Sequence, residues 1–288
     1  MGIFDQNRNS SGRGFGGRLI LALIIAAMGY FLYWNQVEVN PITGEKQHVA
    51  ISPDQEIRLG LASAAEMARE MGGELPADHP KTLEVKKIGN LIVSSSKAKN
   101  SPWKFQFHLL ADDKTVNAFA LPGGQIFITQ GLLDKLLSEA QLAGVLAHEM
   151  GHVIERHTAE QMAKSQLGQL LIAAVATGAS DSRNSTGAYG PMVIASVVNQ
   201  MFQLRYSRQD ESEADQWGIK LMSQAGFNPR AMIEVMVILK ASSQRGNLPD
   251  MFQTHPDPDL RIKQIKAYLL AHPPETNLIE GKKLKSAF

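Results

Sequence analysis

Two histidines four residues apart, His148 and His152, enclose a glutamate in the sequence HEMGH. On a helix, side chains at positions i and i+4 lie one above the other on the same face, so both imidazoles could bind one metal ion. Glu149 follows the first histidine and could act as general base toward a metal-bound water. The alternative is a pair of solvated histidines on a surface helix. We interpret the motif as the centre of a metal-dependent hydrolase.

The helix that carries this motif is predicted to begin at Ser138, because Ser138 and Gln141 have the spacing of a capping box. Four apolar residues then recur at helical spacing: Leu142, Val145, Leu146 and Met150. The helix is expected to continue through His157, which would then lie about 180° around it from His148. That position makes His157 a poor third ligand, and we interpret it as a surface residue or a neighbour of the ligands.

A later acidic segment, residues 205–217 with the sequence RYSRQDESEADQW, supplies the third ligand. A catalytic zinc ion usually has three protein ligands and a water. On a helix Glu211 and Asp215 share a face, so Glu211 can bind the metal while Asp215 accepts a hydrogen bond from a ligand histidine. Glu213 lies about 200° from Glu211 and is interpreted as a surface acid or a helix partner. Taken alone, the segment would be an acidic helix start that the macrodipole favours.

A small sheet is predicted before the motif. Residues 103–109 alternate between apolar and polar side chains and predict a half-buried strand. Residues 117–129 predict two short strands joined at a Pro-Gly-Gly turn, so the sheet should be antiparallel in part. A strand beside a metalloprotease site commonly offers its edge to an extended peptide, and an ordinary core hairpin is the alternative. The candidate substrate edge consists of Asn117, Ala118, Phe119, Ala120 and Leu121.

Two apolar segments, 167–179 and 191–202, are too short to span a bilayer. They are predicted to pack as a hairpin of core helices, with a pair that dips into the membrane as the alternative. The sequence between them, 178–190, is rich in Gly, Ser and Asn and predicts a loop, which could also act as a lid.

Composition excludes several classes of protein. The chain has 288 residues, a net charge of +1 and no cysteine. Disulfides, Cys-ligated zinc and thiol nucleophiles are therefore excluded. No run of Lys and Arg with interleaved aromatic residues is present, so no nucleic-acid partner is expected. A chain without cysteine also suits an oxidising compartment.

An uncharged apolar run, residues 19–34, follows a polar stretch that contains three arginines. The run predicts one membrane anchor, and the positive-inside rule keeps the N-terminus in the cytoplasm and places the rest of the chain on the other side of the membrane. A cleaved signal peptide is the alternative. The expected order is a cytoplasmic tail (1–18), the anchor (19–34), a polar linker (35–51), the zinc metallopeptidase domain (52–272) and a C-terminal tail (273–288), whose residues 281–288 are expected to be frayed.

Four sequence segments occur in an order that resembles a known family of zinc peptidases. They are NAFALPGGQIFITQGLL, the HEMGH motif, SRQDESEAD and THPDPDLRI, and the match covers roughly residues 52–270. The family includes HtpX, the CAAX prenyl endopeptidases and the mitochondrial Oma-type proteases. The chain looks most similar to the bacterial, single-anchor Oma-like branch.

This resemblance implies a gluzincin with an α+β, mostly helical domain and a small, partly antiparallel sheet. It implies one Zn²⁺ per chain, with Glu211 of an E-x-x-x-D pattern as third ligand beside Asp215. It also implies protein substrates, namely misfolded or damaged membrane and envelope proteins that are cut in quality control. The chain lacks the additional spanning helices, helical repeats and lipoprotein cysteine of some relatives, so the resemblance defines the chemistry better than the substrate.

The oxyanion formed during hydrolysis needs a further hydrogen-bond donor. The candidates, in order, are His255, Arg208, Tyr206 and Arg261. His255 could instead occupy the open zinc position in a resting state, or cap a turn. Permanent ligation by His255 would favour a non-catalytic, membrane-tethered zinc chaperone or adaptor, because structural zinc sites are closed. A non-haem iron enzyme is a further alternative, although no strand-borne H-x-D is present.

Overall fold

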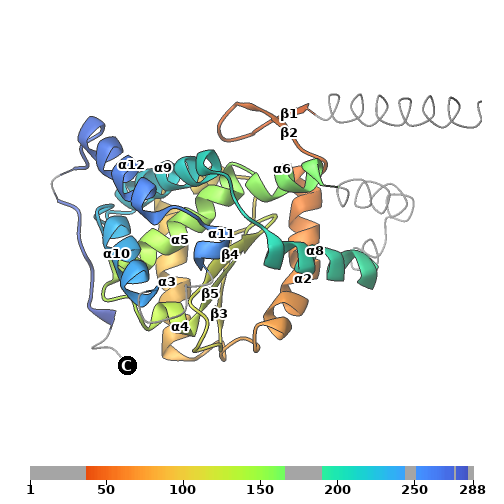
Figure 1. Ribbon diagram of the computed structural model, residues 1–288, viewed down its shortest axis with the longest axis horizontal. Helices are drawn as coiled ribbons and strands as arrows, with labels where there is room; N and C mark the ends of the chain where they lie inside the picture. The colour runs from red at the N-terminus through yellow and green to blue at the C-terminus, as the bar shows by residue number, and fades with distance from the viewer. Residues whose placement is uncertain (1–36, 166–189, 244–250, 276, 285–288) are drawn as a thin grey trace, which may run out of the picture.

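The computed structural model describes residues 37–165, 190–243, 251–275 and 277–284 (Figure 1). The fold is mostly helical with small sheets, as predicted. One helix, α5 (Glu139–Ile154), lies at its centre, and all of its residues are buried. Figure 1 shows α5 between the sheet and the helices of the C-terminal half. The motif HEMGH therefore lies in the core and not on a surface helix.

Two helices precede the sheet. The first, α2 (Pro53–Glu70), begins with the full capping box of Ser52 and Gln55. Proline suits its first position, where the missing N–H would have no helical partner. The second, α3 (Pro80–Ser95), begins after His79, whose side chain accepts a hydrogen bond from the N–H of Lys81. A 3₁₀ turn, η1 (Lys97–Asn100), leads from α3 toward the sheet.

The main sheet has the order β3-β5-β4, with β3 (Gln106–Leu110), β4 (Ala118–Leu121) and β5 (Gln125–Thr129). β3 is parallel to β5 and β4 is antiparallel to it, so the sheet is antiparallel in part, as predicted. β5 is buried throughout and β4 forms one edge. The turn between them requires glycine: Gly123 has a φ of 80°, and a Cβ there would lie 2.4 Å from the Cα of Ile57 in α2.

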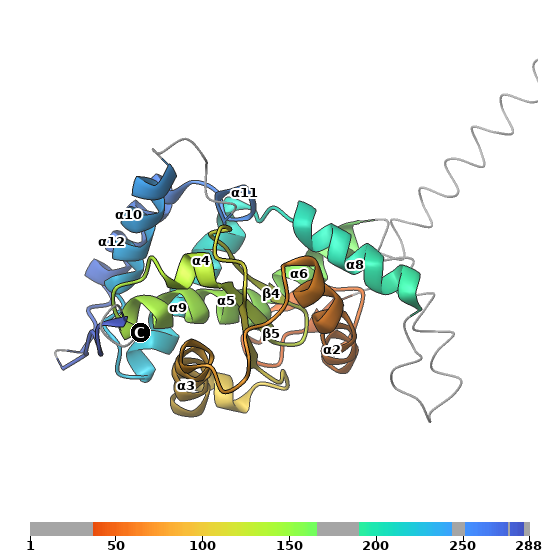
Figure 2. The same ribbon diagram turned by 90° about the horizontal axis from the view of Figure 1, so that it is seen from below.

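The helices that follow the sheet are α4 (Gln130–Leu133), α6 (His157–Lys164), α8 (Pro191–Gln203), α9 (Arg208–Gln224), α10 (Ala231–Ser243), α11 (Met251–Thr254) and α12 (Pro258–Ala271). Figure 2 shows α10 and α12 at one end of the molecule and α2 and α8 at the other. α9 packs along α5, and a Cβ at Gly151 would lie only 2.7 Å from the carbonyl oxygen of Ala214. This close approach brings the acidic start of α9 to the histidines of α5.

Segments from the two ends of the described chain cap the two ends of α5. The hairpin of β1 (Val37–Val39) and β2 (Lys46–His48) supplies Asn40, whose Nδ2 donates to the carbonyl oxygen of Ile154 at 2.7 Å. At the other end the N–H of Ala140 donates to the carbonyl oxygen of Glu280 at 2.9 Å. Thus much of the expected polar linker is an ordered hairpin, because its amide side chains cap a buried helix. Contrary to the expected fraying, residues 279–284 make backbone hydrogen bonds.

Among the described residues, every helix is too short or too polar to cross a bilayer. The expected tail and anchor (1–34) and the first apolar segment (167–179) lie outside the described residues. So does the expected loop 178–190, apart from its last residue. The second apolar segment forms α8, which packs against α2.

Candidate metal centre

The structure brings His148 and His152 together on one face of α5. Their Nε2 atoms are 3.1 Å apart, and both rings are buried. The helix begins as predicted, with the Ser138 hydroxyl accepting from the N–H of Gln141. The two imidazoles, one helical turn apart on α5, therefore point at a common position.

Glu211 reaches the same position from α9. Its Oε2 lies 3.5 Å from Nε2 of His148, and its Oε1 lies 3.6 Å from Nε2 of His152. A capping box of Ser207 and Asp210 starts α9, so Glu211 lies in its first turn and points into the core. Burial opposes ionisation of Glu211, but Arg261 and His255 outweigh it and lower the pKa of this carboxyl.

The spacing of these three side chains fits a metal ion. A zinc ion with ligands at about 2.0–2.1 Å holds neighbouring tetrahedral ligands roughly 3.3–3.4 Å apart. The two imidazole nitrogens are 3.1 Å apart, and each lies 3.5 or 3.6 Å from a different oxygen of the Glu211 carboxylate, so all three side chains reach one position. Imidazole nitrogens and a carboxylate are also the donor types that zinc takes in catalytic sites.

His255, directly after α11, is the fourth member of the cluster. Its Nδ1 lies 2.9 Å from Oε1 of Glu211 and 3.3 Å from Nε2 of His148. Burial opposes protonation of His255, but Glu211 and Glu149 outweigh it and raise its pKa. One donor atom from each of His148, His152, Glu211 and His255 lies within 4.8 Å of the others.

Glu149 lies beside this cluster without a partner of its own. Within the described part of the chain, both of its carboxylate oxygens are buried and lack a hydrogen bond. The nearest cationic group is Nε2 of His255, 3.7 Å from Oε1 of Glu149. Burial raises the pKa of Glu149, as expected for a carboxyl group that could take up a proton.

A buried ion pair stands behind His148. Asp215 Oδ1 lies 3.0 Å from Nδ1 of His148, and Arg261 of α12 donates from Nε to Oδ2 of Asp215 at 2.9 Å. Arg261 also reaches Oε2 of Glu211 at 2.8 Å. Burial opposes ionisation of Asp215, but Arg261 outweighs it and lowers the pKa of Asp215 far below its usual range.

Sequence reasoning did not find this role of Arg261, which was considered only as an oxyanion donor. A signal was present, because two acids on one buried helix face need a cation nearby.

His157 is a neighbour of His152, which is one of the two places predicted for it. The helix does not continue through it: α5 ends at Ile154, and Arg156 adopts a left-handed conformation with φ 59° before α6 begins. Because of this break the His157 ring contacts the His152 ring, with 2.9 Å between their Nδ1 atoms. Glu213 is only partly a surface acid, because its Oε2 lies 3.1 Å from Nε2 of His157.

Two predicted site groups lie outside the cluster. Arg208 is exposed at the start of α9 and forms an ion pair with Asp257. The candidate substrate edge forms β4, preceded by Asn117, and its strand lies at the edge of the main sheet. A cavity of about 240 Å³ beside it is lined by Asn117 and Phe119 together with Met67, Met71 and Met201.

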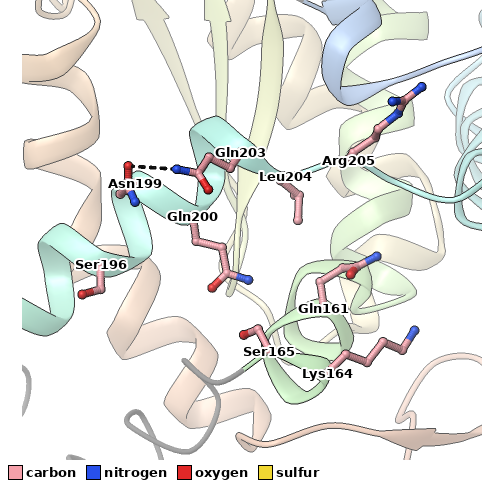
Figure 3. A pocket seen from close by; sticks show the side chains of 9 residues that line it. All are labelled: Gln161, Lys164, Ser165, Ser196, Asn199, Gln200, Gln203, Leu204 and Arg205. Carbon is pink, nitrogen blue, oxygen red and sulfur yellow. Dashed lines mark hydrogen bonds between the residues drawn. The ribbon is translucent and has the colours of Figure 1, made fainter.

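A second cavity of about 600 Å³ lies between α6 and α8 (Figure 3). Its lining is mostly polar, with Gln161, Asn199 and Gln203 among its side chains, and Gln203 donates to Asn199 in Figure 3. No residue of the donor cluster lines it, so this cavity is separate from the metal centre.

Comparison with known proteins identifies the family. The sequence pattern of peptidase family M48 matches residues 80–269, which include the whole donor cluster. The chain belongs to peptidase family M48. This M48 chain is thus a metalloendopeptidase, a hydrolase of peptide bonds, which confirms both the resemblance and the enzyme class inferred from its motifs.

Relatives of this M48 chain occur in mitochondria and bacteria. Mitochondrial metalloendopeptidase OMA1 of Schizosaccharomyces pombe is 32% identical over 252 residues, which cover 87% of this chain and 71% of the relative. OMA1 of Saccharomyces cerevisiae is 30% identical over 266 residues, which cover 88% and 74%. The beta-barrel assembly-enhancing protease of Escherichia coli is 27% identical over 256 residues, which cover 86% of this chain and 51% of the relative.

Proposed function

We propose that this M48 peptidase is a zinc enzyme in which His148, His152 and Glu211 hold the ion and Glu149 is the general base. The observation that carries the proposal is the Glu149 carboxylate, which is buried and unpartnered within the described residues beside three correctly spaced donors. Burial of a carboxylate without a hydrogen bond is costly. The position of Glu149 therefore implies that a water or a substrate normally donates a hydrogen bond to it.

The residues divide the chemistry between them. Zinc, when bound, supplies a Lewis acid that polarises a peptide carbonyl and acidifies a water molecule. Glu149 takes the proton of that water, and it then passes the proton to the leaving amine. Asp215 accepts from Nδ1 of His148 and so keeps Nε2 of that ring free for the metal.

His255 is our candidate for the donor to the oxyanion. Its Nε2 is buried, lacks a hydrogen bond within the described residues and faces the Glu149 side of the cluster. A donor aimed at the carbonyl oxygen stabilises charge that develops in the transition state. Arg208 pairs with Asp257, two residues after His255, and so could hold the segment that carries this donor.

The substrate is proposed to lie along β4 as an extended strand. The carbonyl oxygen of Asn117 accepts from the N–H of Thr129, so alternation along the ladder turns the main-chain groups of Ala118 and Ala120 away from β5. A peptide could pair with these groups, while the methionine-lined cavity beside Phe119 accepts an apolar side chain.

Membrane and envelope proteins are the substrate class we propose. The support is the resemblance to Oma-type proteases and the relative named as beta-barrel assembly-enhancing. The uncharged run 19–34 supports single-pass attachment to the inner membrane with the peptidase domain in the periplasm. The full chain should then stay with membranes during alkaline extraction, and its release into the soluble fraction would contradict attachment.

The second candidate function is a closed structural zinc site in a non-catalytic chaperone or adaptor. The observation that favours it is His255, whose Nδ1 completes a set of four donors. The two functions differ in one measurable respect. A closed site binds zinc without turnover, whereas an enzyme loses turnover when the base is replaced.

The test compares zinc content and casein proteolysis between the wild type and Glu149→Gln. The variant should bind one zinc ion per chain, while its proteolysis falls by about 10²–10⁴-fold. Glu66→Gln, at a half-buried acid of α2 that pairs with Arg69, is the matched control and should cut casein normally. Near-normal proteolysis by Glu149→Gln would refute the base assignment, and a zinc-loaded wild type that cuts nothing would favour the closed site.

A further inference from the structure

The contact between His152 and His157 determines where both protons lie. A histidine that binds a metal through Nε2 is neutral and carries its proton on Nδ1. His152 must therefore donate across the 2.9 Å between the two Nδ1 atoms, and His157 must accept. His157 then carries its own proton on Nε2, which faces Oε2 of Glu213 at 3.1 Å. A directed line of hydrogen bonds thus runs from the metal centre to a half-buried carboxylate.

Glu213 is suited to the outer end of this line. Its side chain is 34% exposed, so water helps to keep the carboxylate ionised, and an ionised carboxylate can only accept hydrogen bonds. Gln209, one turn earlier on α9, donates to Oε1 of Glu213 at 2.9 Å and leaves Oε2 for His157. Both atoms of the carboxylate are therefore used in one fixed orientation.

The fold holds His157 in place through Arg156. A non-glycine residue in the left-handed region costs roughly 1–3 kcal/mol and persists only where its surroundings fix it. The guanidinium of Arg156 is buried and donates to Oε1 of Glu56 at 2.7 Å and to the carbonyl oxygen of Ile51 at 2.7 Å. Both partners lie about 100 residues earlier in the chain. The break between α5 and α6 is therefore built by tertiary contacts.

We propose that His157, backed by Glu213, is the positioning residue that orients His152 for metal binding. The proposal rests on the metal centre described above. Ligand histidines usually donate their second ring N–H to a carboxylate, a carbonyl or water, and loss of that partner typically lowers metal affinity 10–100-fold. Here a second histidine, His157, accepts that N–H and donates its own N–H to the carboxylate of Glu213.

The same region offers a rival use. Donor atoms of His157, Asp210 and Glu213 lie within 4.8 Å of one another and could hold a second ion. The contact with His152 favours positioning, because an ion on Nε2 of His157 would leave the proton of that ring on Nδ1, where it would face the Nδ1 proton of His152. The number of zinc ions bound per chain distinguishes the two.

The test uses two substitutions of similar size in the full chain. His157→Leu removes the acceptor, whereas His157→Asn places an amide oxygen near the position of Nδ1. The zinc dissociation constant, measured by competition with a chelator, should rise 10–100-fold in His157→Leu. His157→Asn should restore most of the lost affinity, and Glu213→Gln, which keeps an acceptor for His157, should weaken binding less than His157→Leu does. Glu66→Gln, at an acid of α2 that pairs with Arg69, serves as the control and should bind zinc as the wild type does.

Thermal unfolding of the zinc-free proteins separates positioning from a general loss of structure. Equal affinity losses in His157→Leu and His157→Asn, or unchanged affinity in His157→Leu, would overturn the role of His157. Two zinc ions per wild-type chain, with one lost in Asp210→Asn, would assign the residues to a second ion instead. A wild type that binds no zinc would overturn the metal centre itself and this inference with it.

Discussion

The two histidines of the metal centre are supported from behind in different ways. His148 contacts Asp215 through Nδ1, and the charge of Asp215 is balanced by Arg261 in a fully buried ion pair. His152 leans on His157, and the carboxylate behind that ring belongs to Glu213, which is 34% exposed. The support of His148 is a buried ion pair. The support of His152 is a neutral imidazole ring whose carboxylate partner is accessible to water.

The difference follows from how each support is placed. Asp215 lies one turn after Glu211 on α9, so the helix that brings the ligand also brings its neighbour. His157 lies on the chain after α5 and reaches His152 only because the helix breaks at Arg156. Helix periodicity places the first support, whereas contacts distant in sequence place the second.

Removal of the cation behind His148 should have the largest effect on stability. In Arg261→Met the carboxylates of Asp215 and Glu211 stay buried without their common counter-ion. Breaking a buried pair in this way typically costs about 3–5 kcal/mol. Urea unfolding of the zinc-free protein should show a loss of that size in the free energy of unfolding.

Two variants calibrate this loss. Arg58→Met removes an exposed arginine of α2 and should change the free energy of unfolding by less than about 0.5 kcal/mol. Glu213→Gln weakens the other support at its solvent-accessible end and should cost less than about 1 kcal/mol. Equal losses in Arg261→Met and Glu213→Gln would show that the two supports do not differ as the burial of their charges implies.

The parts of the site that the sequence predicted depend on helix geometry. The motif on α5 and the pair Glu211 and Asp215 on α9 share their faces at one-turn spacing, and the structure places all of them in one cluster. The cap at Ser138 marks the start of α5 in the sequence itself. These features depend on residues three or four positions apart, so a short stretch of sequence is enough to predict them.

The parts that escaped prediction depend on distant contacts. Nothing in the sequence around Arg156 resembles a helix stop, because neither glycine nor proline is present there. The stop is made by Glu56 and Ile51, which bind the guanidinium, and by Asn40, which caps the carbonyl group of Ile154. The sequence predicts a linker where the hairpin that contains Asn40 lies, for the same reason. Its polar side chains find their hydrogen-bond partners only at the end of α5, which is distant in the sequence.

A second support of His152 is the ring of Tyr206, and loss of its hydroxyl should have a smaller effect than loss of the Arg261 cation. Tyr206 stacks on the His152 ring, with centroids 3.8 Å apart and 22° between the planes, and its hydroxyl lies 3.0 Å from Oγ1 of Thr158. Tyr206→Phe keeps the stack and loses that hydrogen bond, so it should lower the free energy of unfolding by about 1 kcal/mol.

In the same variant, kcat for casein should stay within about threefold of the wild type, because the hydroxyl is directed at α6 and not needed for the chemistry. Thr158→Val removes the other partner, and the double variant should cost less than the sum of the two because both lose one shared bond. A fall in kcat of about a hundredfold at unchanged stability would instead place the hydroxyl at the developing oxyanion. In that case the His152 side would hold a catalytic donor as well as a ligand, and the contrast between the two supports would be one of function as well as of burial.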